Sequence, residues 1–160
     1  VVYNGKNVEP EVSIRYLGKK LKEDKDYTLE YFNNGSVTNN ARVVITGIGD
    51  YSKSLSFTFA ILPFDLSKVK AKKIKKRVYT GYEICPEQKI SLEKEVLMPN
   101  IEYTCTYENN LNAGTATVTV KGKGNYFESK DSTFIINKVL ILKCKRKGRN
   151  LTSFQLFLCT

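Results

Sequence analysis

The chain has 160 residues, a formal net charge of +10 and no histidine. The lack of histidine excludes histidine-based catalytic triads and removes both the commonest general base and the commonest metal ligand. No stretch approaches the roughly 18 apolar residues of a transmembrane helix. Serine and cysteine occur without a recognisable activating partner. We therefore predict a protein that is not an enzyme, with no catalytic, cofactor-binding or metal-binding residues and no cofactor.

The positive charge is concentrated in two segments. Residues 1–62 carry 8 basic and 7 acidic side chains, and residues 77–138 carry 7 basic and 8 acidic ones. The excess lies in residues 63–76, with 6 basic and 1 acidic, and in residues 139–160, with 5 basic and none acidic. A nucleic-acid-binding surface more often combines a basic face with aromatic stacking platforms. We expect no nucleic-acid partner and interpret the lysines as the solvated side of an edge strand, where they oppose aggregation.

Alternating polar and apolar residues predict a series of short strands along the chain. In the first part the expected strands are 1–8, interrupted by the turn signal Asn4-Gly5, then 11–16, 27–31, 41–46 and 54–61. The last run is the most regular, and its alternate residues should form one buried face. These residues are Leu55, Phe57, Phe59 and Ile61.

Pro63 marks a junction in the chain. Lysines then alternate with small or apolar residues, which predicts a strand at 66–74. Further strands are expected at 87–92, 103–107, 116–121 and 132–136. No segment shows helical periodicity, so the predicted class is all-β.

Many residues recur at a nearly constant distance, which is the signature of an internal repeat. A first set recurs 76 positions later: Tyr3, Gly5, Pro10 and Asn33-Asn34 return as Tyr79, Gly81, Pro86 and Asn109-Asn110. After the Asn pairs the distance is 75: Gly47, Tyr51, Phe59 and Ile61 return as Gly122, Tyr126, Phe134 and Ile136. One residue was gained or lost in a loop, where length changes are best tolerated.

The repeat predicts two small β-sandwich modules, residues 1–62 and residues 63–138. The second begins with its lysine-rich strand, so the first lacks the corresponding opening strand. That strand is expected before Val1, in a longer protein of which this chain is a piece. Residues 139–160 are expected to be the opening strand of a third repeat or a divergent tail, with Lys143-Cys144-Lys145-Arg146 aligning roughly with Lys70-Ala71-Lys72-Lys73.

A set of short motifs in the second repeat carries a resemblance to a known family. They are Tyr79-Thr80-Gly81 with Pro86, Glu102-Tyr103-Thr104, Tyr107-Glu108-Asn109-Asn110, the run from Gly114 to Tyr126, and Phe134-Ile135-Ile136. The chain resembles the tandem Ig-like modules of the MBG/YDG type found in surface-anchored and secreted proteins of Gram-positive bacteria. The first repeat departs from the family wording at Asn39-Asn40, Ile48 and Asp50.

The resemblance implies an extracellular, cell-surface or secreted protein that acts as a stalk, spacer or adhesive segment. It supplies no active-site residues to transfer. The implied partners are neighbouring modules of the same chain. The alternative is a module that binds a carbohydrate or an anionic cell-wall polymer, for which Lys68, Lys70, Lys72 and Lys73 are the candidate contacts.

The four cysteines include no C-x-x-C pair, which argues against a zinc site. They are Cys85, Cys105, Cys144 and Cys159. In an exported protein a disulfide between Cys85 and Cys105 is one alternative. The simpler interpretation places Cys105 among small core residues on the face of Tyr103 and Tyr107.

Three further groups have both a structural and a functional interpretation. Glu23, Asp24 and Asp26 could bind Ca²⁺, but a solvated loop is the simpler reading. The Asn pairs could contact a ligand, although Asn at a strand end readily adopts left-handed backbone geometry and bonds nearby backbone. The recurring tyrosines could stack on sugars, but core packing with a solvated hydroxyl is favoured.

Overall fold

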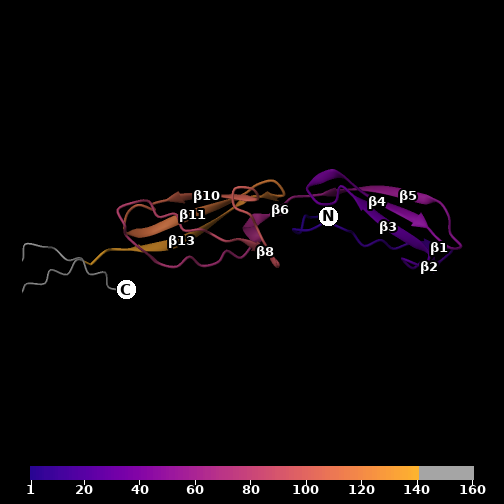
Figure 1. Ribbon diagram of the computed structural model, residues 1–160, viewed down its shortest axis with the longest axis horizontal. Helices are drawn as coiled ribbons and strands as arrows, with labels where there is room; N and C mark the ends of the chain where they lie inside the picture. Colours follow the sequence, from indigo (N-terminus) through magenta and orange to yellow (C-terminus); the bar gives the residue numbers. More distant parts are fainter. Residues whose placement is uncertain (141–160) are drawn as a thin grey trace, which may run out of the picture.

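The computed structural model describes residues 1–140, and these form a nearly all-β, sandwich-like fold. The only helical element in that range is a short 3-10 turn, η1, at Leu66–Lys68. No helix among the described residues is long and apolar enough to cross a membrane. Most of the predicted third opening strand, the tail, Cys144 and Cys159 lie outside the described residues. Figure 1 shows two groups of strands placed end to end along the long axis.

The first half of the chain contains one three-stranded antiparallel sheet and one small hairpin. The sheet has the order β3-β4-β5, formed by Tyr27–Phe32, Thr38–Gly47 and Ser54–Ile61. The hairpin pairs β1 (Arg15–Tyr16) with β2 (Lys19–Lys20). Leu17 and Gly18 connect its strands with positive φ values of 48° and 82°, a conformation that glycine adopts at no steric cost.

The second half contains a four-stranded sheet of order β10-β11-β13-β7. The first three strands are antiparallel and span Tyr103–Glu108, Gly114–Gly122 and Ser129–Asn137. The edge strand β7 (Arg77–Val78) runs parallel to β13. Two smaller pairs complete this half: β8 (Ser91–Leu92) with β9 (Glu95–Val96), and β12 (Tyr126–Phe127) with β6 (Phe64–Asp65).

The two halves make several identical hydrogen bonds at matched positions. The Tyr31 hydroxyl donates to the Pro10 carbonyl at 2.6 Å, and the Tyr107 hydroxyl donates to the Pro86 carbonyl at 2.7 Å. The Asp26 carboxylate accepts from a backbone amide four residues before it at 2.9 Å, as Glu102 does at 2.7 Å. The predicted count of two modules stays a prediction, but the local hydrogen bonds of the halves correspond.

The largest hydrophobic cluster runs across the junction between the halves. It joins Tyr3, Val8, Ala41 and Ile61 of the first half to residues of the second half, including Leu66 and Tyr126. The rings of Tyr3 and Tyr126 meet edge to face, with centroids 5.7 Å apart. The Val37 amide also donates to the side-chain oxygen of Asn125 at 2.8 Å. Ile61 and Leu66 are both 1 % exposed, so the connection itself is part of the core.

Six predicted strands are confirmed with small shifts of their ends. They are the runs at 27–31, 41–46, 54–61, 103–107, 116–121 and 132–136, which correspond to β3, β4, β5, β10, β11 and β13.

Four predicted strands are wrong or too long. Residues 1–8 make only isolated contacts, with the end of β5 through Tyr3 and with the loop after β3 through Val8, so no ladder forms. Of 11–16 and 87–92, only the last two residues of each are paired, as β1 and β8. Residues 66–74 begin with η1 and then run extended without a strand partner. Their backbone carbonyls accept from side chains instead of from a neighbouring strand.

Candidate functional site: an apolar groove and a basic segment

A large apolar hollow lies on the inner face of the first sheet. It is an open groove of about 740 Å³ between the segment that precedes the β1–β2 hairpin and the strands β4 and β5. Ile14, Tyr16, Val43, Tyr51, Leu55 and Phe57 are among its lining residues. The size falls in the range of ligand-binding pockets.

The exposure of this groove corrects the predicted buried face of β5. Ile61 is 1 % exposed and Phe59 is half-buried, as expected for alternate residues facing a core. Leu55 and Phe57 lie on the same face but are 60 % and 54 % exposed. Their cross-strand neighbours Ile45 and Val43 are buried. Val12 and Ile14 pack against the cluster that contains Val43 and Ile45 of β4. No described residue buries Leu55 and Phe57 of β5 in the same way, which is the physical reason for the difference.

A second, more polar hollow of about 580 Å³ adjoins the first. Glu9, Glu11 and Glu23 line it together with Tyr27 and Tyr31. Burial raises the pKa of both tyrosines, and the charge of Glu23 raises it further. The Tyr31 hydroxyl donates to the Pro10 carbonyl, and Lys20 and Lys22 also line this hollow, so it combines carboxylates with ammonium groups.

The acidic cluster Glu23, Asp24 and Asp26, the candidate Ca²⁺ site, lies in a loop that two of its residues stabilise. Asp26 is 9 % exposed, and its carboxylate accepts from the Lys22 amide. Asp24 has a positive φ of 61°, and its amide donates to the Tyr27 carbonyl at 2.9 Å. Asn100 and Glu102 make the same two contacts in the second half. Within residues 1–140 there is no group of three His, Cys, Asp or Glu side chains that could hold a metal ion.

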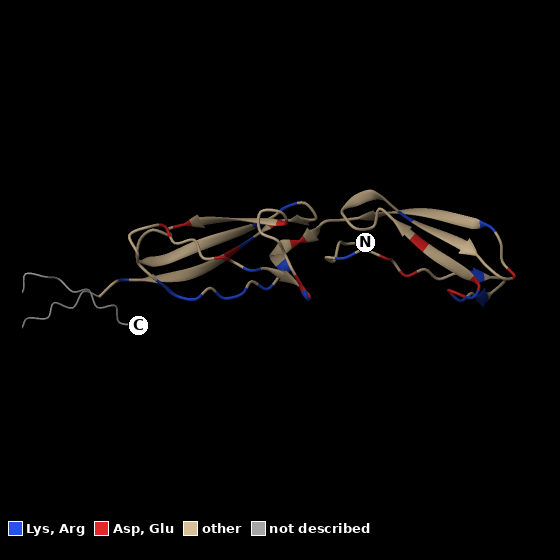
Figure 2. Cartoon of the chain, viewed as in Figure 1, with Lys and Arg blue, Asp and Glu red and all other residues tan. Residues whose placement is uncertain are grey.

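The lysine-rich segment between η1 and β7 is the most basic feature of the described chain (Figure 2). Its apolar residues turn inward, with Val69 6 % exposed and Ile74 half-buried, while Lys70, Lys72 and Lys73 are exposed. The predicted alternation of exposed lysines with buried residues is therefore confirmed, although the segment is not a sheet strand. With Lys75 and Lys76, five exposed cationic side chains lie along this one segment, an arrangement that suits a polyanionic chain.

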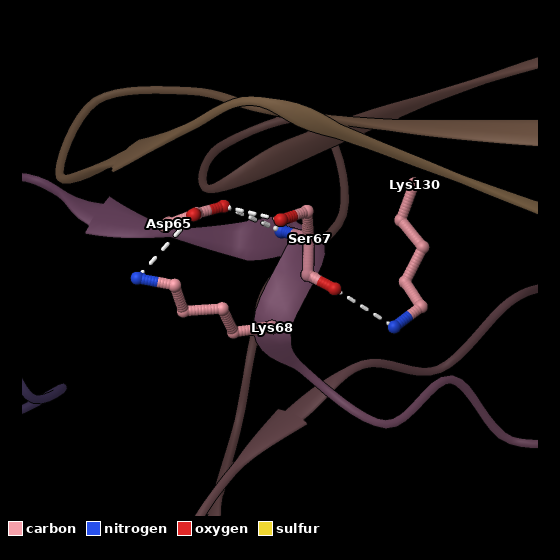
Figure 3. Close-up of polar contacts among 4 residues, drawn as sticks. All are labelled: Asp65, Ser67, Lys68 and Lys130. Atoms are coloured by element: carbon pink, nitrogen blue, oxygen red, sulfur yellow. Dashed lines mark hydrogen bonds and ion pairs between the residues drawn. The ribbon is translucent and has the colours of Figure 1, made fainter.

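The start of this segment is held by a local set of polar contacts (Figure 3). The Asp65 carboxylate accepts from the amide of Ser67 at 3.0 Å and from its hydroxyl at 2.6 Å. These bonds, and then the charge of Lys68, lower the pKa of Asp65. From β13, the Lys130 ammonium donates to the Ser67 carbonyl at 2.8 Å and also to the Val69 carbonyl.

The Asn pairs have a structural role that the sequence indicated in part. Asn33 and Asn109 have φ values of 53° and 55°, which confirms the left-handed geometry. Their neighbours Asn34 and Asn110 are 8 % exposed. These side chains bond distant backbone, not local backbone, because their amide groups donate to the Val8 and Ile84 carbonyls.

The recurring tyrosines are mostly core residues, as predicted, except Tyr79, which is 38 % exposed. The predicted solvated hydroxyl is wrong for Tyr103, whose buried hydroxyl donates to the Gln88 carbonyl at 2.9 Å. Tyr126 is 3 % exposed and its hydroxyl has no hydrogen-bond partner, so it is not solvated as expected. Burial, followed by the nearby Glu102 charge, raises the pKa of Tyr126. The thiols of Cys85 and Cys105 are both free, and burial raises the pKa of the Cys105 thiol.

Comparison with family models, with curated proteins and with solved structures finds no match to this chain.

Proposed function

We propose that the chain is a non-catalytic spacer or adhesive segment built from two equivalent β modules, residues 1–62 and residues 63–138. The observation that carries the proposal is the hydrophobic cluster that continues through the junction. A flexible linker would leave the ends of both halves exposed, whereas Ile61 and Leu66 are buried on either side of Pro63. A spacer needs this property, because it must hold what it carries at a set distance.

The contacts at the junction favour a limited range of angles between the halves. Tyr126 packs edge to face with Tyr3 from the first half and with Phe64 from the connection. The hydrogen bond from the Val37 amide to Asn125 adds a directional contact. As the family resemblance implies, we place this spacer outside a Gram-positive cell, in a secreted or surface-anchored protein.

A distance distribution between spin labels tests the spacer role. One label is placed on each half, at Lys19→Cys and Asn112→Cys, in a background without the native cysteines. We expect one narrow distribution that broadens when Tyr126→Ala removes the ring at the junction. A broad distribution in the parent protein would contradict a semi-rigid spacer. Equal unfolding midpoints for parent and background verify that the cysteine replacements are tolerated.

The second candidate is binding of an anionic wall polymer through the lysine-rich segment. The observation that favours it is the exposure of Lys68, at the end of η1, and of Lys70, Lys72 and Lys73 in the extended segment that follows. Replacing all four with Gln should abolish salt-sensitive binding to teichoic acid. The matched control replaces four exposed lysines of the first half, Lys19, Lys20, Lys22 and Lys25, and should retain the binding. Equal loss in both variants, or equal binding of DNA at low salt, would indicate only a non-specific effect of charge.

A further inference from the structure

The groove of the first half has a counterpart in the second half. By the repeat distances, Ile14, Tyr51, Leu55 and Phe57 correspond to Ile90, Tyr126, Lys130 and Ser132. Ile14 and Tyr51 of the first half are half-buried, whereas their counterparts Ile90 and Tyr126 are 1 % and 3 % exposed. The two grooves therefore differ in what covers them.

Residues 64–72 of the same chain cover the second groove. The segment enters by parallel pairing of β6 with β12, in which Phe64 lies opposite Tyr126. Leu66 and Val69 then bury their side chains in the cluster that contains Ile90, Tyr103 and Val120. This segment, which includes the 3-10 turn η1, lies against the inner face of a sheet, with apolar residues three positions apart as anchors.

Side chains of the second groove also hold the backbone of this segment. Lys130 donates to the Ser67 and Val69 carbonyls, and the Gln88 side-chain amide donates to the Lys72 carbonyl at 2.9 Å. Burial of Leu66 and Val69, at 1 % and 6 % exposure, shows that the fit is close. The covering segment is therefore an integral part of the second half.

We propose that the open groove of the first half binds an extended polypeptide segment of the same chemistry as residues 64–72. The occupant has an aromatic residue followed by two apolar anchors, and it runs beside Tyr51 as β6 runs beside Tyr126. This inference uses the correspondence between the halves, as the proposed function does, but it does not require a spacer role. A peptide can dock in this groove whether or not the junction is stiff.

The differences between the grooves indicate how the first would hold its occupant. Val12, Leu55 and Phe57 stand where the second half has Gln88, Lys130 and Ser132. Three polar side chains are thus replaced by apolar ones, so docking depends on apolar contacts more than on side-chain hydrogen bonds. Glu11 and Asp26 line the groove together with Arg15 and Lys53, so the charges of its lining balance.

The test adds a second copy of residues 63–76 directly before Val1 of the full chain. Val1 corresponds to Arg77 by the repeat distance of 76. The added copy therefore precedes Val1 in the same register in which residues 63–76 precede Arg77. Hydrogen exchange of the amides in residues 48–58 is then compared with the parent chain. Docking should slow this exchange by about tenfold or more and raise the urea midpoint of the first half. A synthetic peptide of residues 63–76 should compete with a fluorescent apolar dye for the groove.

Two controls separate docking from general effects of the added segment. Replacing the anchors corresponding to Leu66 and Val69 by Ser in the added copy keeps every lysine and should abolish the protection. Phe57→Lys in the groove should also abolish it, whereas Phe32→Lys on the outer face of the same sheet should not. Unchanged exchange in residues 48–58 with the intact added copy would overturn the proposal. So would equal protection with the Ser-substituted copy, or dye binding that the peptide does not displace. The spin-label distances report separately on the spacer role.

Discussion

The ammonium of Lys130 on β13 lies 2.8 Å from the Ser67 carbonyl and donates a hydrogen bond to it, although the two residues are 63 positions apart in the chain. The same ammonium also donates to the Val69 carbonyl. These bonds tie the extended covering segment to the sheet, in place of the backbone ladder that a paired strand would have. The Lys130 ammonium thus supplies hydrogen bonds that the backbone amides of a neighbouring strand would otherwise donate.

Lys130→Met should weaken the second half without changing its fold. The variant retains the unbranched side-chain stem but loses two charge-assisted hydrogen bonds, and we expect a loss of about 1 kcal/mol in the free energy of unfolding, because the site is partly exposed to water. Urea denaturation measures this difference. Lys121→Met on β11, an exposed lysine, is the control and should change the midpoint little. Equal effects in the two variants would contradict a specific role for Lys130.

The left-handed residues of the Asn pairs give a second prediction. Asn109 has a φ of 55°, a region that Ala enters only at a steric cost. Asn109→Ala should therefore lower the free energy of unfolding by about 1 kcal/mol, whereas Asn109→Gly should cost less. Thermal unfolding of both variants measures the two losses of stability and gives their order. Asn112→Ala, in the same exposed loop, should be nearly neutral, and a ranking in which Gly is worse than Ala would refute the backbone explanation.

The strands that the sequence predicted correctly share one physical property. β3, β10, β11 and β13 have one face on a core and one face toward solvent, so buried and exposed residues alternate along them with a period of two. The sequence predicts the ends of the strands less well. For example, β4 begins at Thr38, three residues before the predicted start. A polar residue at a strand end keeps its backbone pairing without any signal in the hydrophobic pattern.

The segments that sequence reasoning misjudged are those whose contacts are not a ladder. Residues 66–74 alternate like a strand, but their carbonyls bond to Lys130 and Gln88, which lie far away in the sequence. The run that includes Leu55 and Phe57 alternates like a buried strand, yet the covering layer is missing from the described chain at this point. The alternation shows which face of a strand could be buried. Whether that face is buried depends on a packing segment that is distant in the sequence. The contrast between Leu55 and Lys130 at matched positions of the two repeats was a signal in the sequence that the two halves differ on this face.

The junction offers a test with a matched position in the other half. Asn125 accepts the hydrogen bond from the Val37 amide at 2.8 Å, and Asp50 is its counterpart in the first half. Asn125→Ala removes the acceptor and should cost about 1 kcal/mol of stability, together with faster hydrogen exchange at Val37. Asp50→Ala, at an exposed site, should change neither quantity. Unchanged exchange at Val37 in Asn125→Ala would show that this bond does not hold the junction.

Alkaline pH should destabilise the second half through Tyr107. Burial, and then the neighbouring thiols of Cys105 and Cys85, raise its pKa to about 12, compared with about 10 in the unfolded chain. Below pH 10 the hydroxyl is neutral in both states, so its contribution to stability is complete. Between about pH 10 and 12 the unfolded chain releases this proton while the folded chain keeps it, and stability falls. The urea midpoint of the second half should therefore decrease across this window.

Tyr107→Phe separates this titration from the packing of the ring. At neutral pH the variant loses the hydrogen bond to the Pro86 carbonyl and should be less stable by about 1 kcal/mol. Its midpoint should then decrease less between pH 10 and 12 than that of the parent, because one group with a raised pKa is gone. Tyr82→Phe is the control, since this ring is 80 % exposed and its loss should leave the parent profile unchanged. A Tyr107→Phe profile parallel to that of the parent would assign the alkaline loss to other groups, such as Tyr103, whose pKa burial also raises.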